Sequence, residues 1–284
     1  MNQKVLSLYG LKWDPFTSDV PVEALRCTAQ IENFAWRVEN LAREGGFALV
    51  SGDPGTGKSV ALRIVVDRLC ALRDLKVGLL VRPHAWAADF YREIGDLFGV
   101  ALVPHNRWAG AKALREKWQA HIDAALFRPV LVIDEAQEMV PTVLSELRLL
   151  ASSRLDSHAL LATVFAGDAR LLDKLRTDDF APVNSRIRVR LMLERASPAD
   201  LEACLRHALE KSGAPRLMTA ELITTLCEHA AGNLRALMNL AGELLVAGAQ
   251  REARQLDEKL FLEVFAAHAP AAEPAKGGVA GRRR

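Results

Sequence analysis

Residues 52–59 read Gly-Asp-Pro-Gly-Thr-Gly-Lys-Ser, a complete G-x-x-x-x-G-K-[ST] loop. An apolar run at 47–50 precedes this phosphate loop, and a helical pattern at 60–72 follows it. The order strand, loop, helix is the setting in which the motif binds a nucleoside triphosphate. A chance glycine-rich turn is the alternative, and the flanking pattern argues against it.

The residue types of the loop suit phosphate chemistry. Its glycines let successive N–H groups turn inward around phosphate oxygens, and the helix N-terminus adds positive potential. We expect Lys58 to reach the β- and γ-phosphates of ATP and the Ser59 hydroxyl to bind Mg²⁺. The predicted cofactor-binding residues of the loop are Gly52, Asp53, Pro54, Gly55, Thr56, Gly57, Lys58, Ser59 and Val60.

A second signal lies downstream, where residues 130–133 are apolar and Asp134 and Glu135 follow directly. Ligands bind at the carboxyl ends of strands in open α/β sheets, so both carboxylates are expected at the phosphates. Asp134 would hold Mg²⁺, and Glu135 would orient and deprotonate the attacking water. Two acidic residues that only cap the next helix are the alternative.

A third strand is predicted at 160–166, and it is followed by Gly167 and Asp168. A polar group at this point could touch the γ-phosphate or the attacking water. A carboxylate repels phosphate, however, so Asp168 could instead cap the following helix. The sequence leaves both interpretations open.

Alternating strands and helices up to residue 196 predict a parallel five-stranded sheet flanked by helices, and residues beyond 197 show helical patterns alone. The fold class is therefore α/β, with a C-terminal all-helical lid. We expect an irregular leader at 1–26 that packs on the nucleotide site, an ATPase core at 27–196, a lid at 197–268 and a disordered basic tail at 269–284.

Composition narrows the class of protein. Half of the 284 residues are hydrophobic and a quarter are charged, as in soluble globular proteins. No apolar stretch approaches the roughly 18 residues that a membrane span needs, and four widely spaced cysteines suit buried thiols in a reducing cytoplasm. The net charge is only +2, so contact with nucleic acid would need a local basic patch.

With these motifs together, the chain resembles the AAA+ ATPases, and within them the ExeA/TniB/TnsC-like group. The resemblance rests on the phosphate loop, the Asp134-Glu135 strand and three further stretches, and it covers about residues 5–267. The further stretches are Tyr9-Gly10-Leu11 with Pro15-Phe16, Gly167-Asp168-Ala169-Arg170-Leu171, and Gly232-Asn233-Leu234-Arg235. Relatives usually have Gly-Gln-Pro-Glu-Leu and Gly-Asn-Pro-Arg at the last two, so the role of Asp168 is in doubt.

The resemblance implies roles for arginines. Arg235 matches the lid arginine that reaches the γ-phosphate, and Arg186 matches the arginine that enters the neighbouring subunit's site. A guanidinium suits a phosphate in transition because it is planar and permanently charged. Arg188 and Arg190 compete with Arg186 for this role, and a solvated surface charge is the alternative for each.

The group includes ATP-binding partners of transposases, which implies a DNA-centred function. Subunits would assemble head to tail into a ring or a helical filament on duplex DNA, without sequence preference, and recruit or activate a transposase, with a targeting protein as a further partner. Candidate DNA contacts are Arg107, Lys112 and Arg115. The alternative is that these residues only form an ordinary helix face and bind no DNA. Trp86 and Trp118 are expected to be core anchors rather than base-stacking groups.

The main alternative is an ATP-driven assembly factor of an ExeA-like secretion complex that does not bind DNA. Secretion-type relatives continue into a membrane span, and this chain does not, so we expect a cytoplasmic protein without membrane contact. A nucleotide-dependent switch with slow turnover is a third possibility. The tail at Arg282–Arg284 could contact DNA or an acidic partner, or it could be solvated.

Overall fold

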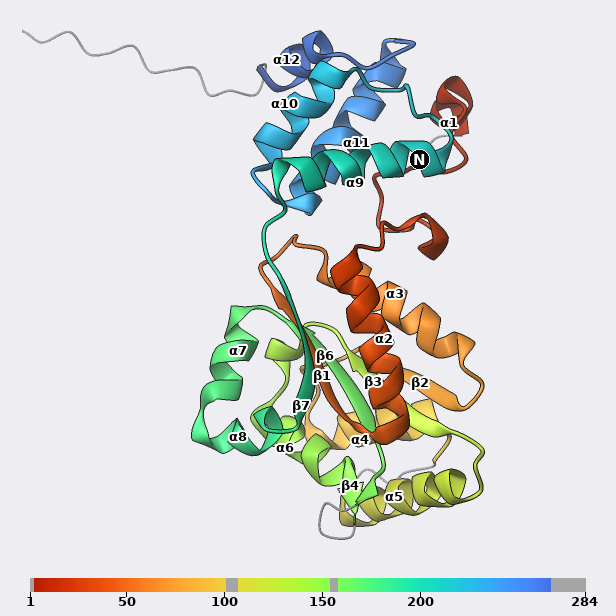
Figure 1. The fold of residues 1–284 in the computed structure, drawn as a ribbon, viewed down its shortest axis with the longest axis vertical. Coiled ribbons are helices and arrows are strands. Elements are labelled where there is room, and N and C mark those ends of the chain that lie inside the picture. The colour runs from red at the N-terminus through yellow and green to blue at the C-terminus, as the bar shows by residue number, and fades with distance from the viewer. Residues whose placement is uncertain (1–2, 101–106, 154–157, 267–284) are drawn as a thin grey trace, which may run out of the picture.

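The protein has two units, a sheet with helices on both faces and a bundle of helices stacked beyond one end of it (Figure 1). The computed structural model describes residues 3–100, 107–153 and 158–266. The predicted basic tail at 269–284 lies outside the described residues. The fold class predicted from the sequence, a parallel five-stranded sheet followed by a helical lid, is confirmed.

The elements of the leader and the sheet unit follow in chain order. They are α1 Gln3–Tyr9, η1 Val22–Ala24, α2 Ala29–Glu44, β1 Gly46–Gly52, α3 Lys58–Ala71, β2 Leu75–Leu80, α4 Ala87–Phe98, α5 Arg107–Asp123, β3 Arg128–Ile133, η2 Ala136–Glu138, α6 Pro141–Leu150, β4 Ser152–Ser153, β5 His158–Ala159, β6 Ala162–Gly167, α7 Ala169–Arg176, η3 Asp178–Phe180, α8 Ala181–Asn184 and β7 Ile187–Leu193. The helical unit contains α9 Pro198–Ser212, α10 Ala220–Ala230, α11 Leu234–Gln250 and α12 Glu258–Ala266.

The strand order of the main sheet decides where the site can form. The order is β2-β3-β6-β1-β7, and every pairing is parallel. Strand β6 therefore lies between β1 and β3, with Ser51 opposite Gly167 and Ile133 opposite Phe165. Because parallel strands end at the same edge, this order brings the residues after β1, β3 and β6 together.

Two hydrophobic clusters fix the sheet between its helices. Side chains of α2 and α3 cover one face, and side chains of α4 to α8 cover the other. The three central strands are buried on both faces, as their largely apolar sequences predict. Trp118 is fully buried as expected, whereas Trp86 is 71% exposed, so the prediction of a core anchor there is wrong. Trp86 is the N-cap of α4, where the backbone is extended rather than helical, so its side chain does not follow the buried face that begins at Phe90.

The leader differs from the irregular segment that was predicted. Residues 3–9 form α1, whose Val5, Leu6 and Tyr9 pack against the core of the helical unit. Leu11 and Phe16 are buried in that same core. The three- and four-residue spacing of the apolar side chains in α1 is a helical signal, and the aromatic and proline residues that follow obscured it.

The rest of the leader crosses to the sheet unit. Val22 and Leu25 pack against the α2–α3 face of the sheet. Arg63 of α3 donates hydrogen bonds to the carbonyl oxygens of Ser18 and Val20, the first at 2.9 Å. The leader thus contacts both the lid core and the helix that follows the phosphate loop.

The cysteines are free thiols in different environments. Cys227 is buried and Cys204 half-buried, but Cys27 and Cys70 are exposed, so the expectation of four buried thiols is wrong for two of them. Burial raises the pKa of Cys227 to about 11. No helix in the described part of the chain is long and apolar enough to span a membrane.

The packing of the leader yields a stability prediction. Leu11→Ala removes a side chain that is only 7% exposed and should lower the free energy of unfolding by about 2–5 kcal/mol. Leu8→Ala is the matched control, because Leu8 is 44% exposed, and it should change stability by about 0.5 kcal/mol or less. Chemical denaturation measures both. Equal effects of the two substitutions would contradict the observed packing.

Candidate functional site

The phosphate loop connects β1 to α3 at the carboxyl edge of the sheet. Gly57 caps α3 with a φ of +100°, a left-handed conformation that favours glycine. Lys58 begins the helix, is 7% exposed, and donates from Nζ to the carbonyl oxygens of Gly52 and Asp53 at 2.9 and 3.1 Å. The loop's own carbonyl groups therefore hold an ammonium group where phosphate oxygens would bind.

Ser59 and Asp134 meet at the first turn of α3. The Ser59 hydroxyl donates to Oδ2 of Asp134 at 3.2 Å, across 75 residues of sequence. A hydroxyl and a carboxylate are oxygen ligands of the kind that Mg²⁺ prefers. In the described part of the chain, no cluster of three or more His, Cys, Asp or Glu could hold a metal. The donor set fits a Mg²⁺ that also takes oxygens from a nucleotide and water.

Glu135 directly follows the metal candidate and has unusual backbone geometry. Its φ of +51° and ψ of +41° are left-handed, which is strained for a residue with a side chain. Its N–H donates to Oδ1 of Asp134 at 2.9 Å. Its carboxylate accepts a hydrogen bond from the Gln137 side chain. Sequence reasoning missed Gln137; its position two residues after Glu135 was the only signal.

Asp168 caps α7, which is one of the two roles that the sequence left open. Its Oδ1 accepts from the Arg170 N–H, and its Oδ2 accepts from the Arg170 Nε, both at 2.9 Å. Burial tends to raise the pKa of Asp168, but the Arg170 hydrogen bonds and charge outweigh it and lower the pKa. Arg170 also pairs with Glu138 at 2.9 Å. A contact between Asp168 and phosphate stays a prediction.

The lid touches the phosphate loop through the N-terminus of α11. Asn233 caps that helix and donates from Nδ2 to the Pro54 carbonyl oxygen at 3.3 Å. The Leu234 N–H donates to the Gly55 carbonyl oxygen at 3.0 Å. Gly55 has a φ of +85°, and a Cβ there would lie 2.1 Å from Asn233 Oδ1. A residue with a side chain at position 55 would therefore push the lid away from the loop.

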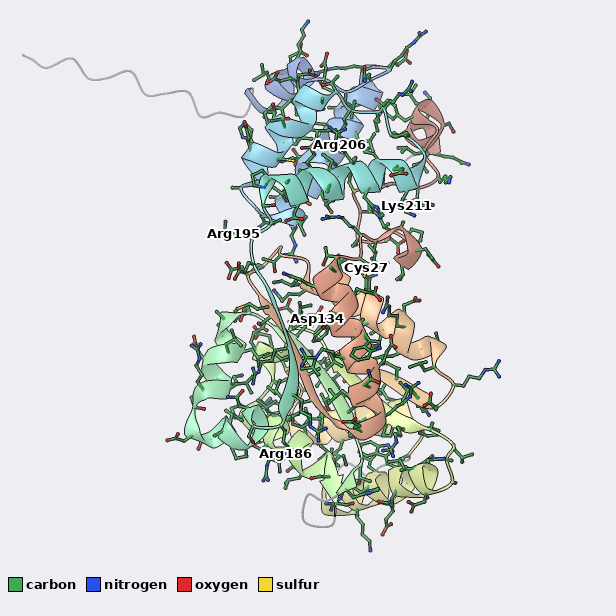
Figure 2. The ribbon with its side chains drawn as sticks, viewed as in Figure 1. Cys27, Asp134, Arg186, Arg195, Arg206 and Lys211 are labelled. Carbon is green, nitrogen blue, oxygen red and sulfur yellow. The ribbon has the colours of Figure 1, made fainter. Side chains whose placement is uncertain are left out.

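Two arginines of the lid side lie near this contact. Arg195, in the connection between the units (Figure 2), pairs with Asp53 at 3.8 Å. Arg235 follows Leu234 at the start of α11 and is exposed. With the described residues Arg235 makes no hydrogen bond or ion pair. Its predicted contact with the γ-phosphate is compatible with this location and stays a prediction.

Arg186 lies at the other edge of the sheet. Its carbonyl oxygen accepts from the N–H of Phe47, at the start of β1, whereas the phosphate loop follows the end of β1. Figure 2 shows Arg186 and Asp134 towards opposite ends of the sheet. The intervening strand spans about 20 Å, so Arg186 cannot serve the site of its own chain. Its guanidinium donates to the Pro182 carbonyl oxygen at 2.6 Å.

The two competing arginines project from the exposed side of the edge strand β7. Arg188 pairs with Glu44 at 3.1 Å, and Arg190 donates to Asn184 Oδ1 at 2.6 Å. All three arginines remain candidates for the site of a neighbouring subunit.

The candidate DNA contacts lie on α5, at the end of the sheet unit far from the lid (Figure 1). Lys112 pairs with Glu116 at 3.7 Å, and Arg115 is half-buried. The side chain of Arg107 lies outside the described residues. The loop from β2 to α4 is more accessible: Arg82 and His84 are exposed, as are Val81 and Trp86 at 79% and 71%.

The observed cap at Asp168 leads to a prediction. Asp168→Ala should lower the free energy of unfolding by about 1 kcal/mol, because the N–H of Arg170 loses its acceptor. Asp168→Asn keeps a side-chain oxygen as acceptor and should cost less than half as much. Thermal unfolding of the two variants is the measurement. An Asn variant as unstable as the Ala variant would show that the ion pair, not the cap, matters.

Comparison with known proteins places these features in a family. Residues 41–175 match the family described as AAA domain. The chain is 30% identical to general secretion pathway protein A of Aeromonas hydrophila over 237 residues, which are 82% of this chain and 42% of that protein. It is 24% identical to the ATP-dependent target DNA activator B of Escherichia phage Mu over 204 residues, 65% of this chain and 61% of that protein.

The chain thus spans less than two thirds of the length of these relatives. Among solved structures, Cdc6p of Pyrobaculum aerophilum superimposes with a TM-score of 0.68 at 16% identity, over 85% of this chain and 67% of that one. At such identity the likeness concerns the fold alone. The matched domain, the two relatives and the site geometry agree: the chain carries an AAA domain at residues 41–175 and is similar to the ExeA/TniB-like group of AAA+ ATPases.

Proposed function

We propose that this protein is an ATP-dependent regulator of DNA transposition, which assembles on duplex DNA and recruits or activates a transposase. Assembly of subunits is inferred because the residues of the predicted site lie at two opposite edges of the sheet. The phosphate loop, Asp134, Glu135 and the start of α11 converge at one edge of the sheet, while Arg186 lies at the other. The similarity to a phage target DNA activator supports the DNA-centred output.

In the proposed reaction, the loop N–H groups and Lys58 bind the β- and γ-phosphates. Ser59 and Asp134 would hold Mg²⁺, which neutralises charge as the bond between the phosphates breaks. Glu135 accepts a proton from water as the water oxygen attacks the γ-phosphorus, and ADP leaves. Arg235 from the lid would bind the γ-phosphate.

Subunits are proposed to associate head to tail. Arg186, or its neighbours Arg188 and Arg190, would then enter the ATP site of the next subunit. Contacts of this type close into a ring or continue as a helical filament, depending on the rotation between subunits. ATP would favour assembly because its γ-phosphate supplies the negative charge that the incoming guanidinium pairs with.

For DNA contact we favour the loop between β2 and α4 over α5. Arg82 and His84 are exposed there, whereas Lys112 of α5 is already paired with Glu116. A duplex bound without sequence preference is held through its phosphates, so exposed positive charge matters most.

A second function is favoured by a specific observation. General secretion pathway protein A matches 82% of this chain at the higher identity of 30%. The corresponding candidate is an ATP-driven assembly factor of a secretion complex, whose ATPase cycle would not depend on duplex DNA.

Electron microscopy and an ATPase assay, each with and without duplex DNA, test the proposal. Glu135→Gln should lower turnover by about 100-fold or more, since it removes the proton acceptor, and should hold ATP-dependent assemblies on DNA. Glu202→Gln, which removes a half-buried carboxylate of α9 that pairs with Arg206, is the control and should behave as wild type. If DNA alters neither assembly nor turnover, the proposed transposition function is contradicted and the secretion-type function is favoured.

The salt dependence of DNA affinity tests the loop. Arg82→Ala should weaken binding and lower the slope of log K against log salt by about one, the value expected for losing one phosphate contact. Lys112→Ala should leave the slope within error. Fluorescence anisotropy at several salt concentrations measures both. A larger change in the slope for Lys112→Ala than for Arg82→Ala would place the DNA contact on α5 instead.

A further inference from the structure

Gln137 is a buried polar residue that joins two strand ends of the site. It lies in the turn η2, two residues after Glu135, and is 6% exposed. Its Nε2 donates to the Glu135 carboxylate, and its Oε1 accepts from the Asp168 N–H at 3.3 Å. Glu135 follows β3 and Asp168 follows β6, so one amide links the ends of both strands.

The partners of this amide fix its orientation. A backbone N–H can only donate, so the side-chain oxygen must face Asp168. An ionised carboxylate can only accept, so the NH₂ group must face Glu135. Glutamine supplies one donor and one acceptor at the required reach. A glutamate would place a second carboxylate beside Glu135, and a methionine would offer no donor.

The surroundings of Gln137 hold it in place from both sides. A Cβ on Gly167 would lie 2.7 Å from the Gln137 Oε1, so the absence of a side chain at the end of β6 makes room for the amide. Lys174 of α7 donates from Nζ to the carbonyl oxygens of Gln137 and Met139 at 2.7 and 2.9 Å. The turn that carries the amide is therefore fixed through its backbone as well.

We propose that Gln137 is a positioning residue for ATP hydrolysis, whose amide holds one carboxylate oxygen of Glu135 and leaves the other to accept the proton of the attacking water. This inference rests on the proposed role of Glu135 as the base. An oriented base accelerates proton transfer because its acceptor oxygen already points at the water. The tie to Asp168 makes the orientation of Glu135 depend on the junction of β6 and α7.

Steady-state ATPase kinetics of Gln137→Met, in the chain of residues 1–284 with Mg²⁺ and ATP, provide the first test. The kcat should fall by about tenfold or more, and the KM for ATP should stay within about twofold of wild type, since general-base effects act on the chemical step. Gln119→Met is the matched control: that half-buried glutamine bonds Asp123 and His158 on α5 and β5, and its kcat should not change.

The double variant of Gln137→Met with Glu135→Gln separates positioning from a general structural effect. If the amide acts through Glu135, adding Gln137→Met to Glu135→Gln should cause no further loss of the residual kcat. The inference would be overturned if the losses in kcat of the two single variants multiply in the double variant. It would also be overturned if Gln137→Met had the kcat of wild type.

Gln137→Glu provides a test that does not depend on Gln137→Met folding. The introduced carboxyl group can donate to Glu135 only when it is protonated, so kcat relative to wild type should rise as the pH falls from 8 towards 6. Two neighbouring carboxyl groups raise each other's tendency to hold a proton, and such pairs titrate in roughly this pH range. A ratio that does not vary with pH would contradict the inference. If Glu135→Gln alone retains full turnover, the proposed function loses its base, an outcome distinct from failure of Gln137 alone.

Discussion

The register of three parallel strands is the constraint on which the site depends. Because β6 pairs with both β1 and β3, their carboxyl ends lie side by side, and each strand is followed by a part of the site. The phosphate loop follows β1, the two carboxylates follow β3, and Asp168 follows β6. Shifting one strand by a single residue would turn its buried side chains to the opposite face. The cores on both faces therefore also fix the positions of the site residues.

The lid adds a second constraint, since it rests on the loop that binds phosphate. The N-terminus of α11 meets the loop at the carbonyl oxygens of Pro54 and Gly55, and these bonds involve no charged side chain. A nucleotide that changes the shape of the loop must also change these contacts. The leader extends the linkage, because Leu11 is buried in the lid core while Val22 packs on the sheet unit. A tilt of the lid would thus move the N-terminus of α11, the phosphate loop and the leader together.

Much of this could be predicted from the sequence because it follows local rules. The phosphate loop has a fixed pattern, and the strand before Asp134 is an uninterrupted apolar run. The sequence-based predictions are wrong where contacts between distant segments determine burial or local structure. Trp86 lies in an apolar-looking helix start yet faces solvent, and α1 forms on the lid although its sequence borders an aromatic, proline-rich stretch. Gln137 was missed because its partners, Glu135 and Asp168, become neighbours only when β3 and β6 pair.

The charges of the site suggest why assembly and turnover should be linked. Within one chain, the Lys58 ammonium is held by loop carbonyls, and the charge of Asp168 is matched by Arg170. A bound triphosphate adds several negative charges to this edge, and Arg235 is one cation of the same chain placed to approach them. Further cations, Arg186, Arg188 and Arg190, line the β7 side of the molecule. A second copy docked by that side would supply the missing charge, so hydrolysis would proceed only where subunits meet.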